Sequence, residues 1–244
     1  MSYLEIKNVS KQYKGLPTLE NINISIDKGE FVSLIGPSGV GKTTLFNILS
    51  GIELPEPSGK ILLDGNDITG KTGMFSYMQQ KDLLLPFYTM LDNISLPLRL
   101  RGLSKKDARE KASVHLEEFG LLGSENKYPA QLSGGMRQRG AFLRAYLYSE
   151  KLMLLDEPFS ALDSITKANL HRWYTEVSHR HHTTTFFITH DIDEALTLSD
   201  KIYVMTGPPG RVEEPLTIER NDDFLLSPQF IEYKKMLLDK LGQK

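Results

Sequence analysis

Cysteine is absent from this chain of 244 residues, which excludes disulfides and thiolate metal sites and fits a reducing compartment. Long apolar runs are absent too. No stretch of about 18 apolar residues offers a membrane span, and the first residues, MSYLEIKN, form no apolar signal segment. A dominant charge of one sign is also missing, because the net charge is only −2. Electrostatics therefore give no reason to expect a nucleic-acid partner.

The hydrophobic pattern predicts the fold class. Apolar or alternating runs typical of strands lie before residue 86 and after residue 150, and helical spacing dominates between them. Strands that alternate with helices predict an α/β fold, with a mostly parallel sheet covered by helices on both faces and a helical insert within it. Strands are expected at residues 3–10, 21–26, 29–36, 60–65, 72–80, 151–156, 183–190 and 201–206.

Helices are expected at residues 42–49 and 164–180. Ser104 is expected to cap another helix, whose apolar stripe runs through Ala108, Ala112, Leu116 and Phe119. The tail has amphipathic spacing and is expected to form a final helix. The predicted division is 1–86 for the first part of the core, 87–148 for the helical insert, 149–226 for the second part of the core and 227–244 for the C-terminal helix.

The stretch GPSGVGKTT matches the phosphate-binding pattern G-x-x-x-x-G-K-[ST] between an apolar strand and a helix. Glycines let the backbone N–H groups wrap phosphates, and the helix N-terminus adds a positive dipole end. The lysine can reach the β- and γ-phosphates, and the hydroxyl after it can bind Mg²⁺. The predicted nucleotide-binding residues here are Gly36, Pro37, Ser38, Gly39, Val40, Gly41, Lys42, Thr43 and Thr44.

A second motif, which is acidic, stands at the end of the stretch LMLLDE. Asp156 ends a predicted buried strand and can hold Mg²⁺, and Glu157 can polarise a water that attacks the γ-phosphate. The alternative is a plain polar exit from the strand into a loop. The presence of the phosphate-binding loop favours the catalytic interpretation.

The stretch QLSGGMRQR predicts another phosphate cradle. Leu132, Ser133, Gly134 and Gly135 precede a basic helix start, where backbone N–H groups and a hydroxyl can stabilise charge on a γ-phosphate. Because this helix belongs to the insert, we expect it to serve the nucleotide of a second copy in a head-to-tail dimer. A simple turn with a helix cap is the alternative.

These motifs resemble those of the ABC-type ATPases, in the order typical of that family, from about residue 3 to 215. LSGGMRQR resembles the family signature, although Met136 stands where Gln is common. Gln80 resembles the Q-loop glutamine; its neighbour Gln79 is the competing assignment, and the following Leu-Leu-Pro favours Gln80. The remaining matches are His190 as the switch histidine, Tyr13 as the aromatic residue that stacks on adenine, and Ser160, Ala161, Leu162 and Asp163 as the D-loop.

The resemblance implies a fold and a set of roles. It implies a RecA-like P-loop core with an antiparallel N-terminal β subdomain, and an active ATPase that uses ATP and Mg²⁺. It makes Glu157 the catalytic carboxylate, lets His190 contact the γ-phosphate, and lets Gln80 link the metal and the attacking water to the helical insert. The implied catalytic residues are Glu157, His190, Gln80 and Lys42, and the implied metal ligands are Thr43, Gln80 and Asp156.

The stretches LLLPFYTMLDNISLPL, VMTGPPGRV and LSPQFIEYKKML resemble those of one subgroup of that family. This subgroup contains the ATPase subunits of bacterial importers for nitrate, sulfonate, taurine and thiamine-precursor pyrimidines. This resemblance implies a homodimer at the cytoplasmic face of the membrane, with separate permease subunits, an extracytoplasmic solute-binding protein and no nucleic acid. An exporter subunit is the alternative, and a non-transport ABC ATPase is a further one. The apolar segment 83–88 is expected either to line a groove for a permease helix or to pack in the core.

Two other stretches have plain interpretations that we prefer. The histidines of SHRHH, residues 178–182, are expected to end a helix rather than to bind a metal. The basic run RGLSKKDAREK, residues 101–111, is expected to be a solvated helix face, with an acidic or lipid partner as the alternative.

Overall fold

The computed structural model describes residues 2–149, 152–160, 162–220 and 224–242. The chain forms two compact units, Met1–Met74 with His182–Lys244, and Phe75–His181. The chain therefore leaves the first unit and later returns to it, as an inserted segment must. The predicted boundaries at residues 87 and 148 concern functional subdomains, and they stay a prediction.

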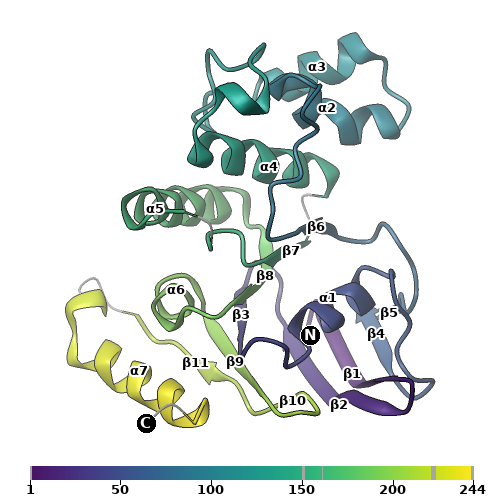
Figure 1. Ribbon diagram of the computed structural model, residues 1–244, viewed down its shortest axis with the longest axis vertical. Helices are drawn as coiled ribbons and strands as arrows, with labels where there is room; N and C mark the ends of the chain where they lie inside the picture. Colours follow the sequence, from purple (N-terminus) through teal and green to yellow (C-terminus); the bar gives the residue numbers. More distant parts are fainter. Residues whose placement is uncertain (1, 150–151, 161, 221–223, 243–244) are drawn as a thin grey trace. The chain divides into compact units, whose positions relative to one another are not determined.

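An antiparallel sheet forms the N-terminal part of the first unit (Figure 1). The strand order is β2-β1-β4-β5, and every pair runs antiparallel. Alternate residues of β1 such as Leu4 and Ile6 are buried, which is how one face of such a sheet covers a core. The strands are β1 (Leu4–Tyr13), β2 (Leu16–Ile26), β4 (Lys60–Leu63) and β5 (Asn66–Asp67).

The first unit also contains a set of parallel strands. Strand β3 (Phe31–Ile35) lies between β8 (Thr184–Thr189) and β9 (Lys201–Thr206) and runs parallel to both. All residues of β3 and β8 are buried, which explains their continuous apolar runs. Ile35 pairs with Thr189, so the residues that follow these two strands leave the sheet at the same edge. Two short strands, β10 (Arg211–Val212) and β11 (Leu216–Thr217), pair antiparallel with β9.

Helices complete the first unit, and its described residues form three α-helices. Helix α1 (Lys42–Leu49) has the predicted bounds, whereas the short α6 (Ile192–Leu198) was not predicted. Helix α7 (Pro228–Lys240) lies beside α6 (Figure 1) and buries Leu237 in a core cluster with residues of α6 and β9. The expected C-terminal helix is therefore present, preceded by the 3₁₀ turn η2 (Phe224–Leu226).

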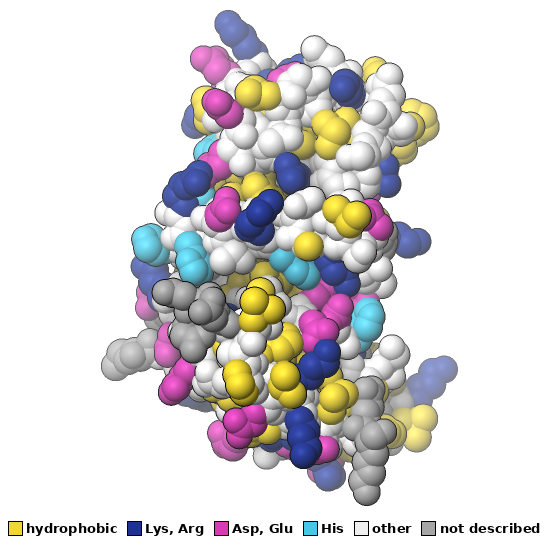
Figure 2. Space-filling model, turned by 90° about the vertical axis from the view of Figure 1, so that its left-hand side faces the viewer, with side chains coloured by type: hydrophobic (Ala, Val, Ile, Leu, Met, Phe, Trp, Pro, Cys, Tyr) yellow, Lys and Arg dark blue, Asp and Glu magenta, His cyan; other side chains and the backbone are white. Residues whose placement is uncertain are grey.

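The outward side of this C-terminal segment carries apolar side chains among charged ones. Hydrophobic side chains gather over it in the lower half of Figure 2. Leu226 is 91% exposed and Ile231 is 69% exposed, whereas Leu237 is fully buried. The helix therefore offers a buried and an exposed large aliphatic residue for direct comparison.

The second unit combines a strand pair with helices. Strand β6 (Ser76–Met78) runs parallel to β7 (Leu152–Asp156), with Met78 opposite Leu155. Helix α2 packs against α3 and α4, and α4 also contacts β6. The helical elements are α2 (Met90–Leu100), α3 (Lys105–Ser113), the 3₁₀ turn η1 (Pro129–Gln131), α4 (Gly134–Tyr148) and α5 (Ser164–His181).

Helix α3 is shorter than predicted. Ser104 caps it as expected, since its hydroxyl accepts from the Asp107 N–H. The helix ends at Ser113, and the N–H groups of His115 and Leu116 bond three residues back instead of four. Leu116 and Phe119 lie in the turns that follow and are still buried. The apolar stripe was right about burial and wrong about helix length.

Candidate functional site

The loop after β3 has a backbone that only glycine fits at two positions. A Cβ on Gly36 would lie 2.4 Å from the Met205 carbonyl oxygen. Gly41 has φ +112° and directly precedes α1, and a Cβ there would lie 2.6 Å from the Leu19 side chain. The pattern G-x-x-x-x-G-K therefore reflects steric demands of this loop. The loop leads directly into the N-terminus of α1, which is the positive end of the helix dipole.

The Lys42 side chain turns back into this loop. Its ammonium donates to the carbonyl oxygens of Gly36 at 2.7 Å and Pro37 at 2.9 Å, and the residue is only 6% exposed. A positive charge is thus held inside a ring of backbone groups. Such a charge attracts phosphate, because an ammonium is drawn more strongly to an anionic phosphate oxygen than to a neutral carbonyl oxygen.

Tyr13 lies at the end of β1 with its phenol against the start of α1. The phenol donates to the Glu53 carboxylate, and the Lys11 ammonium lies 5.3 Å from the ring centroid. Burial and the bond to Glu53 raise the pKa of Tyr13, and a bond with the Thr44 hydroxyl acts in the opposite direction. Tyr13 therefore touches the residue with which the predicted phosphate loop ends.

His190 follows β8 directly and is exposed. The buried Thr189 hydroxyl before it donates to Glu194 at 2.6 Å and accepts from the Asp191 N–H at 3.0 Å. Asp191 in turn caps α6 by accepting from the Asp193 and Glu194 N–H groups. Because β3 and β8 are paired in register, His190 and Gly36 leave the sheet at the same edge.

Asp156 and Glu157 belong to the second unit. Asp156 ends β7 and is buried, and its carboxylate accepts from the Tyr77 hydroxyl at 3.3 Å. Burial and the negative charge of Asp156 raise the pKa of Tyr77 far above its ordinary value, so this phenol remains a neutral donor. Glu157 has φ +46°, an uncommon conformation for a residue with a side chain and one often found at functional sites.

The Gln80 amide joins two of the predicted site residues. Its Nε2 donates to Glu157 Oε2 and to Ser160 Oγ, at 3.2 Å each. The Ser160 hydroxyl also donates to the Glu157 carbonyl at 2.9 Å. These residues meet because β6 and β7 are paired, so the segments after both strands emerge side by side. The contacts favour Gln80 over Gln79 as the functional glutamine.

Ser133 is the N-cap of α4 and accepts from the Met136 N–H at 3.2 Å. The N–H groups of Gly134 and Gly135 belong to the first helical turn, where no acceptor exists within the helix. A Cβ on Gly134 would lie 3.3 Å from the Leu162 side chain, and one on Gly135 would lie 3.1 Å from Thr166. The Leu132 side chain is buried. The glycines therefore allow α4 to approach the segment that begins α5.

Asp163 belongs to that segment. Its carboxylate accepts from the Thr166 side chain and backbone N–H, the latter at 3.0 Å, and these bonds lower its pKa. Asp163 is therefore an anionic cap at the start of α5, where the helix dipole favours negative charge. Ala161, also predicted for this motif, lies outside the described residues.

The contacts of three α4 residues were not predicted from the sequence. Gln138 donates to the Pro158 carbonyl, and Arg137 bonds Asp82 Oδ2 at 3.2 Å. Arg144 donates to the backbone carbonyls of Asp82 at 2.6 Å and of the next residue at 2.8 Å. Burial lowers the pKa of Arg144, which the Asp82 charge partly offsets. Helix α4 is thus bonded to the segment that follows Gln80 and to the segment that follows Glu157.

The segment after Gln80 is apolar and largely open to solvent. Leu83 is 49%, Leu85 40% and Phe87 89% exposed, whereas Leu84 is buried. Of the two predicted alternatives, core packing holds for Leu84, and the others present an apolar surface on the second unit.

The basic run and the histidine run have partners within the second unit. Lys105 lies 3.3 Å and Arg109 2.7 Å from Asp92 Oδ1, so part of the basic charge is neutralised. His181 Nε2 lies 3.0 Å from Glu118 Oε1, and its Nδ1 lies 3.2 Å from the Tyr146 hydroxyl. Within the described part of the chain, no group of three or more His, Cys, Asp or Glu side chains could hold a metal.

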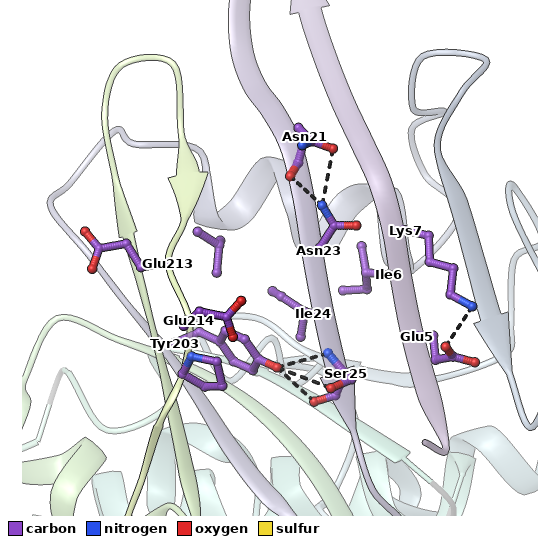
Figure 3. A pocket seen from close by; sticks show the side chains of 12 residues that line it. Glu5, Ile6, Lys7, Asn21, Asn23, Ile24, Ser25, Tyr203, Glu213 and Glu214 are labelled. Carbon is purple, nitrogen blue, oxygen red and sulfur yellow. Dashed lines mark hydrogen bonds and ion pairs between the residues drawn. The ribbon is translucent and has the colours of Figure 1, made fainter. Parts of the chain in front are cut away.

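An open pocket of about 440 Å³ lies elsewhere in the first unit, against β1, β2 and β9 (Figure 3). Glu5, Glu213 and Glu214 line it, and the Tyr203 hydroxyl at its base is already bonded to Ser25. Lys7 also lines it and lies 2.8 Å from Glu5, so three carboxylates face one ammonium and the acidic lining does not suit a nucleotide.

The geometry of both units is typical of one class of protein. A buried parallel strand, a glycine loop and a helix that starts with lysine form the phosphate-binding unit of P-loop nucleoside triphosphatases. The structure groups the P-loop with Tyr13 and His190 in the first unit. It groups Gln80, Asp156, Glu157 and the Ser-Gly-Gly helix start in the second.

Comparisons with known proteins give the family. Residues 19–160 match the family described as ABC transporter. The formylaminopyrimidine import ATP-binding protein ThiZ of Halalkalibacterium halodurans is 43% identical over 207 residues, which cover 84% of this chain and 80% of ThiZ. The aliphatic sulfonates import ATP-binding protein SsuB of Bacillus cereus is 39% identical over 237 residues, or 96% of this chain and 92% of SsuB.

Solved structures agree with the sequence relatives. The dimeric structure of the bacterial ABC transporter cassette MJ0796 matches with a TM-score of 0.76 and 31% identity, and covers 89% of this chain and 100% of that chain. A dimeric post-hydrolysis state of the same cassette, bound to ADP and Pi, matches with a TM-score of 0.76 and 30% identity.

This chain belongs to the ABC transporter family. It is an ATPase of that family that uses ATP with Mg²⁺, and it has the P-loop fold with an antiparallel β sheet and inserted helices. The predicted fold class, enzyme class and cofactors are confirmed, and so is the resemblance to the importer group. None of the described helices is long and apolar enough to cross a membrane.

Proposed function

We propose that this chain powers a separate membrane permease that imports a small organic or anionic solute. The main support for ATP-driven work is the set of hydrogen bonds from Gln80 to Glu157 and Ser160, which follow the buried Asp156 in the chain. The names of ThiZ and SsuB, both import proteins, support the direction of transport.

The first unit binds the nucleotide in this proposal. The N–H groups of residues 36–41 surround the phosphates, and Lys42 exchanges its two loop carbonyls for the β- and γ-phosphates. Tyr13 stacks on adenine, a contact worth about 1–3 kcal/mol between bases and aromatic residues. His190 reaches the γ-phosphate from the same edge of the sheet as the loop.

The second unit supplies the hydrolytic groups. Glu157 accepts a proton from the attacking water and orients it, and the Gln80 amide holds the Glu157 carboxylate in place. For Mg²⁺, Gln80 and Asp156 of this unit and Thr43 of the first unit offer oxygen ligands of the kind the ion prefers. When bound there, Mg²⁺ neutralises charge on the phosphates.

The start of α4 completes the site of a second copy. Ser133, Gly134 and Gly135 offer a hydroxyl and the N–H groups of the first helical turn, where the helix dipole attracts a γ-phosphate. Two chains placed head to tail would thus enclose two ATP molecules, each between one P-loop and the partner's Ser-Gly-Gly. The dimeric MJ0796 structures support a dimer. Leu162 lies beside this helix start, Asp163 bonds the neighbouring Thr166, and both would border the interface together with Ser160.

The helical insert transmits closure to the permease. ATP shifts the population toward the closed dimer, and phosphate release shifts it back. Arg137 and Arg144 tie α4 to the segment after Gln80, so both move together. The exposed Leu83, Leu85 and Phe87 then present the apolar surface on which a permease helix docks. The subunit would sit at the cytoplasmic face of the membrane, with a solute-binding protein on the other side.

Two assays test the proposal. In the first, purified wild type hydrolyses ATP with Mg²⁺, and Lys42→Ala and Glu157→Gln each lose about 10²-fold or more in kcat/KM. In the second, the chain is co-expressed with the membrane proteins of its genomic neighbourhood. Phe87→Asp should abolish co-purification with them and spare hydrolysis, whereas Leu226→Asp, at an equally exposed position, should change neither. Equal co-purification of both variants would refute the docking surface.

A further inference from the structure

The proposed hydrolysis does not use Glu53, whose carboxylate lies beside the predicted nucleotide-binding residues. It lies in the loop after α1, and its side chain is 24% exposed. One oxygen accepts from the Tyr13 phenol, and the other accepts from Asn47 Nδ2 at 3.1 Å. The Lys11 ammonium lies 3.8 Å from Glu53 Oε2. Glu53 therefore contacts both the strand that carries Tyr13 and the helix that starts with Lys42.

These contacts restrain the Tyr13 ring at two points. Glu53 holds the phenol oxygen, and the Lys11 ammonium lies over the ring at 5.3 Å from its centroid. Lys11 is itself anchored, because it donates to the Leu54 carbonyl at 2.8 Å. The cation covers one ring face, which leaves the opposite face to stack on a base. An exposed tyrosine without these contacts would lose side-chain entropy on binding, which weakens affinity.

The bond between Glu53 and Tyr13 is charge-assisted. The bond from Tyr13 is the main cause that lowers the pKa of Glu53, and Asn47 and Lys11 act in the same direction. The pKa of Tyr13 is raised, by burial first and by Glu53 second. At neutral pH the carboxylate is therefore ionised and the phenol keeps its proton. Such bonds are shorter and stronger than those between neutral groups.

We propose that Glu53 is a positioning residue of the nucleotide site, which holds the Tyr13 ring in place for the adenine base. This rests on the proposed function, since it requires Tyr13 to stack on adenine. Glu53 acts on nucleotide affinity through Tyr13 and leaves the hydrolytic groups of the second unit untouched.

The test measures the Kd for ATP by calorimetry and the KM and kcat for hydrolysis. Glu53→Ala should raise Kd and KM about three- to tenfold, which is the effect of one hydrogen bond, with kcat within about twofold. Glu53→Gln should recover most of the affinity, because its amide oxygen still accepts from the phenol. Tyr13→Phe should match Glu53→Ala, and the double variant should be no weaker than either single one.

A neighbouring carboxylate provides the matched control. Glu56 lies in the same loop and accepts from the Gln12 N–H at 3.3 Å, without contact to Tyr13. Glu56→Gln should leave Kd unchanged. If Glu53→Ala fails to fold, as judged by circular dichroism, the other two variants still test the proposal. Glu53→Gln should keep most of the affinity for ATP, whereas Tyr13→Phe should lose it.

Three results would overturn the proposal: an unchanged Kd in Glu53→Ala, a tighter Kd, or a double variant whose losses multiply. Tyr13→Ala separates this failure from failure of the proposed function. If Tyr13→Ala weakens ATP binding and Glu53→Ala does not, only the role of Glu53 is wrong. If Tyr13→Ala binds ATP like wild type, the stacking role is wrong as well. Hydrolysis that survives in Lys42→Ala would contradict the P-loop assignment itself.

Discussion

A single methyl group on Gly36 should disable the phosphate loop. In the structure the added Cβ would lie 2.4 Å from the Met205 carbonyl oxygen and 3.2 Å from Val40 Cγ1. Ordinary contact begins at 3.4 Å, so the loop and strand β9 must separate by 3.4 − 2.4 = 1.0 Å. The obstacle is backbone of a buried strand, which cannot rotate away as a flexible side chain could.

The expected effects of Gly36→Ala follow from this distance. Overpacking of this kind costs about 1–3 kcal/mol of unfolding free energy. A misplacement of about 1 Å among positioned groups can cost about 10²-fold in rate. Urea unfolding and steady-state ATP hydrolysis measure the two effects. We expect a stability loss in that range and a fall in kcat/KM of about 10²-fold.

Gly65→Asn serves as the control for Gly36→Ala. Gly65 has φ +75°, a conformation that asparagine tolerates, and an added Cβ meets nothing within 4 Å. This variant should keep wild-type hydrolysis and lose less than about 1 kcal/mol. A Gly36→Ala protein that unfolds and hydrolyses ATP like wild type would refute the steric reasoning.

Two further predictions concern stability. Leu237→Ala on α7 removes a fully buried side chain and should lower the free energy of urea unfolding by about 2–5 kcal/mol. Ile231→Ala, at a 69% exposed position of the same helix, should change it by no more than about 0.5 kcal/mol. Equal losses would contradict the packing of α7. Burial would raise the pKa of Asp92, but hydrogen bonds from Arg109, Lys105 and a threonine hold it below the ordinary value. The ionised Asp92 therefore stabilises the fold above the unfolded pKa of about 3.9. This stabilisation is lost as the pH falls through the lower folded pKa. The difference in unfolding free energy between wild type and Asp92→Asn should therefore shrink from pH 7 toward pH 3, and a constant difference would argue against this ion pair.

The sequence predicts elements best where local chemistry sets their ends. The bounds of α1 match because a glycine loop must end where the helix begins, and β9 matches because its apolar run stops at polar residues. Strands β5, β10 and β11 were missed, because two-residue strands exist only through the partner strands beside them. Helix α6 was missed because seven residues show less than two turns of periodicity.

The same distinction holds for the site. The predicted motif residues each lie in a short pattern with its own chemistry, such as a glycine loop or a carboxylate after a buried strand. Arg137 and Gln138 lie within the stretch LSGGMRQR but received no predicted role, and Arg144 and Glu53 belong to no such pattern. Their partners lie 55, 20, 62 and 40 residues away along the chain, so only the folded structure reveals them.

The central claim is a composite site built from two copies of the chain, and light scattering on Glu157→Gln with ATP and Mg²⁺ tests it most directly. The variant should bind ATP without hydrolysing it and should accumulate as a stable dimer. The wild type should return to monomers as it hydrolyses ATP. Adding a Ser133→Arg substitution, which places a bulky side chain at the helix start, should abolish the dimer and leave ATP binding intact. A Glu157→Gln protein that binds ATP, remains monomeric and hydrolyses at the wild-type rate would contradict the account.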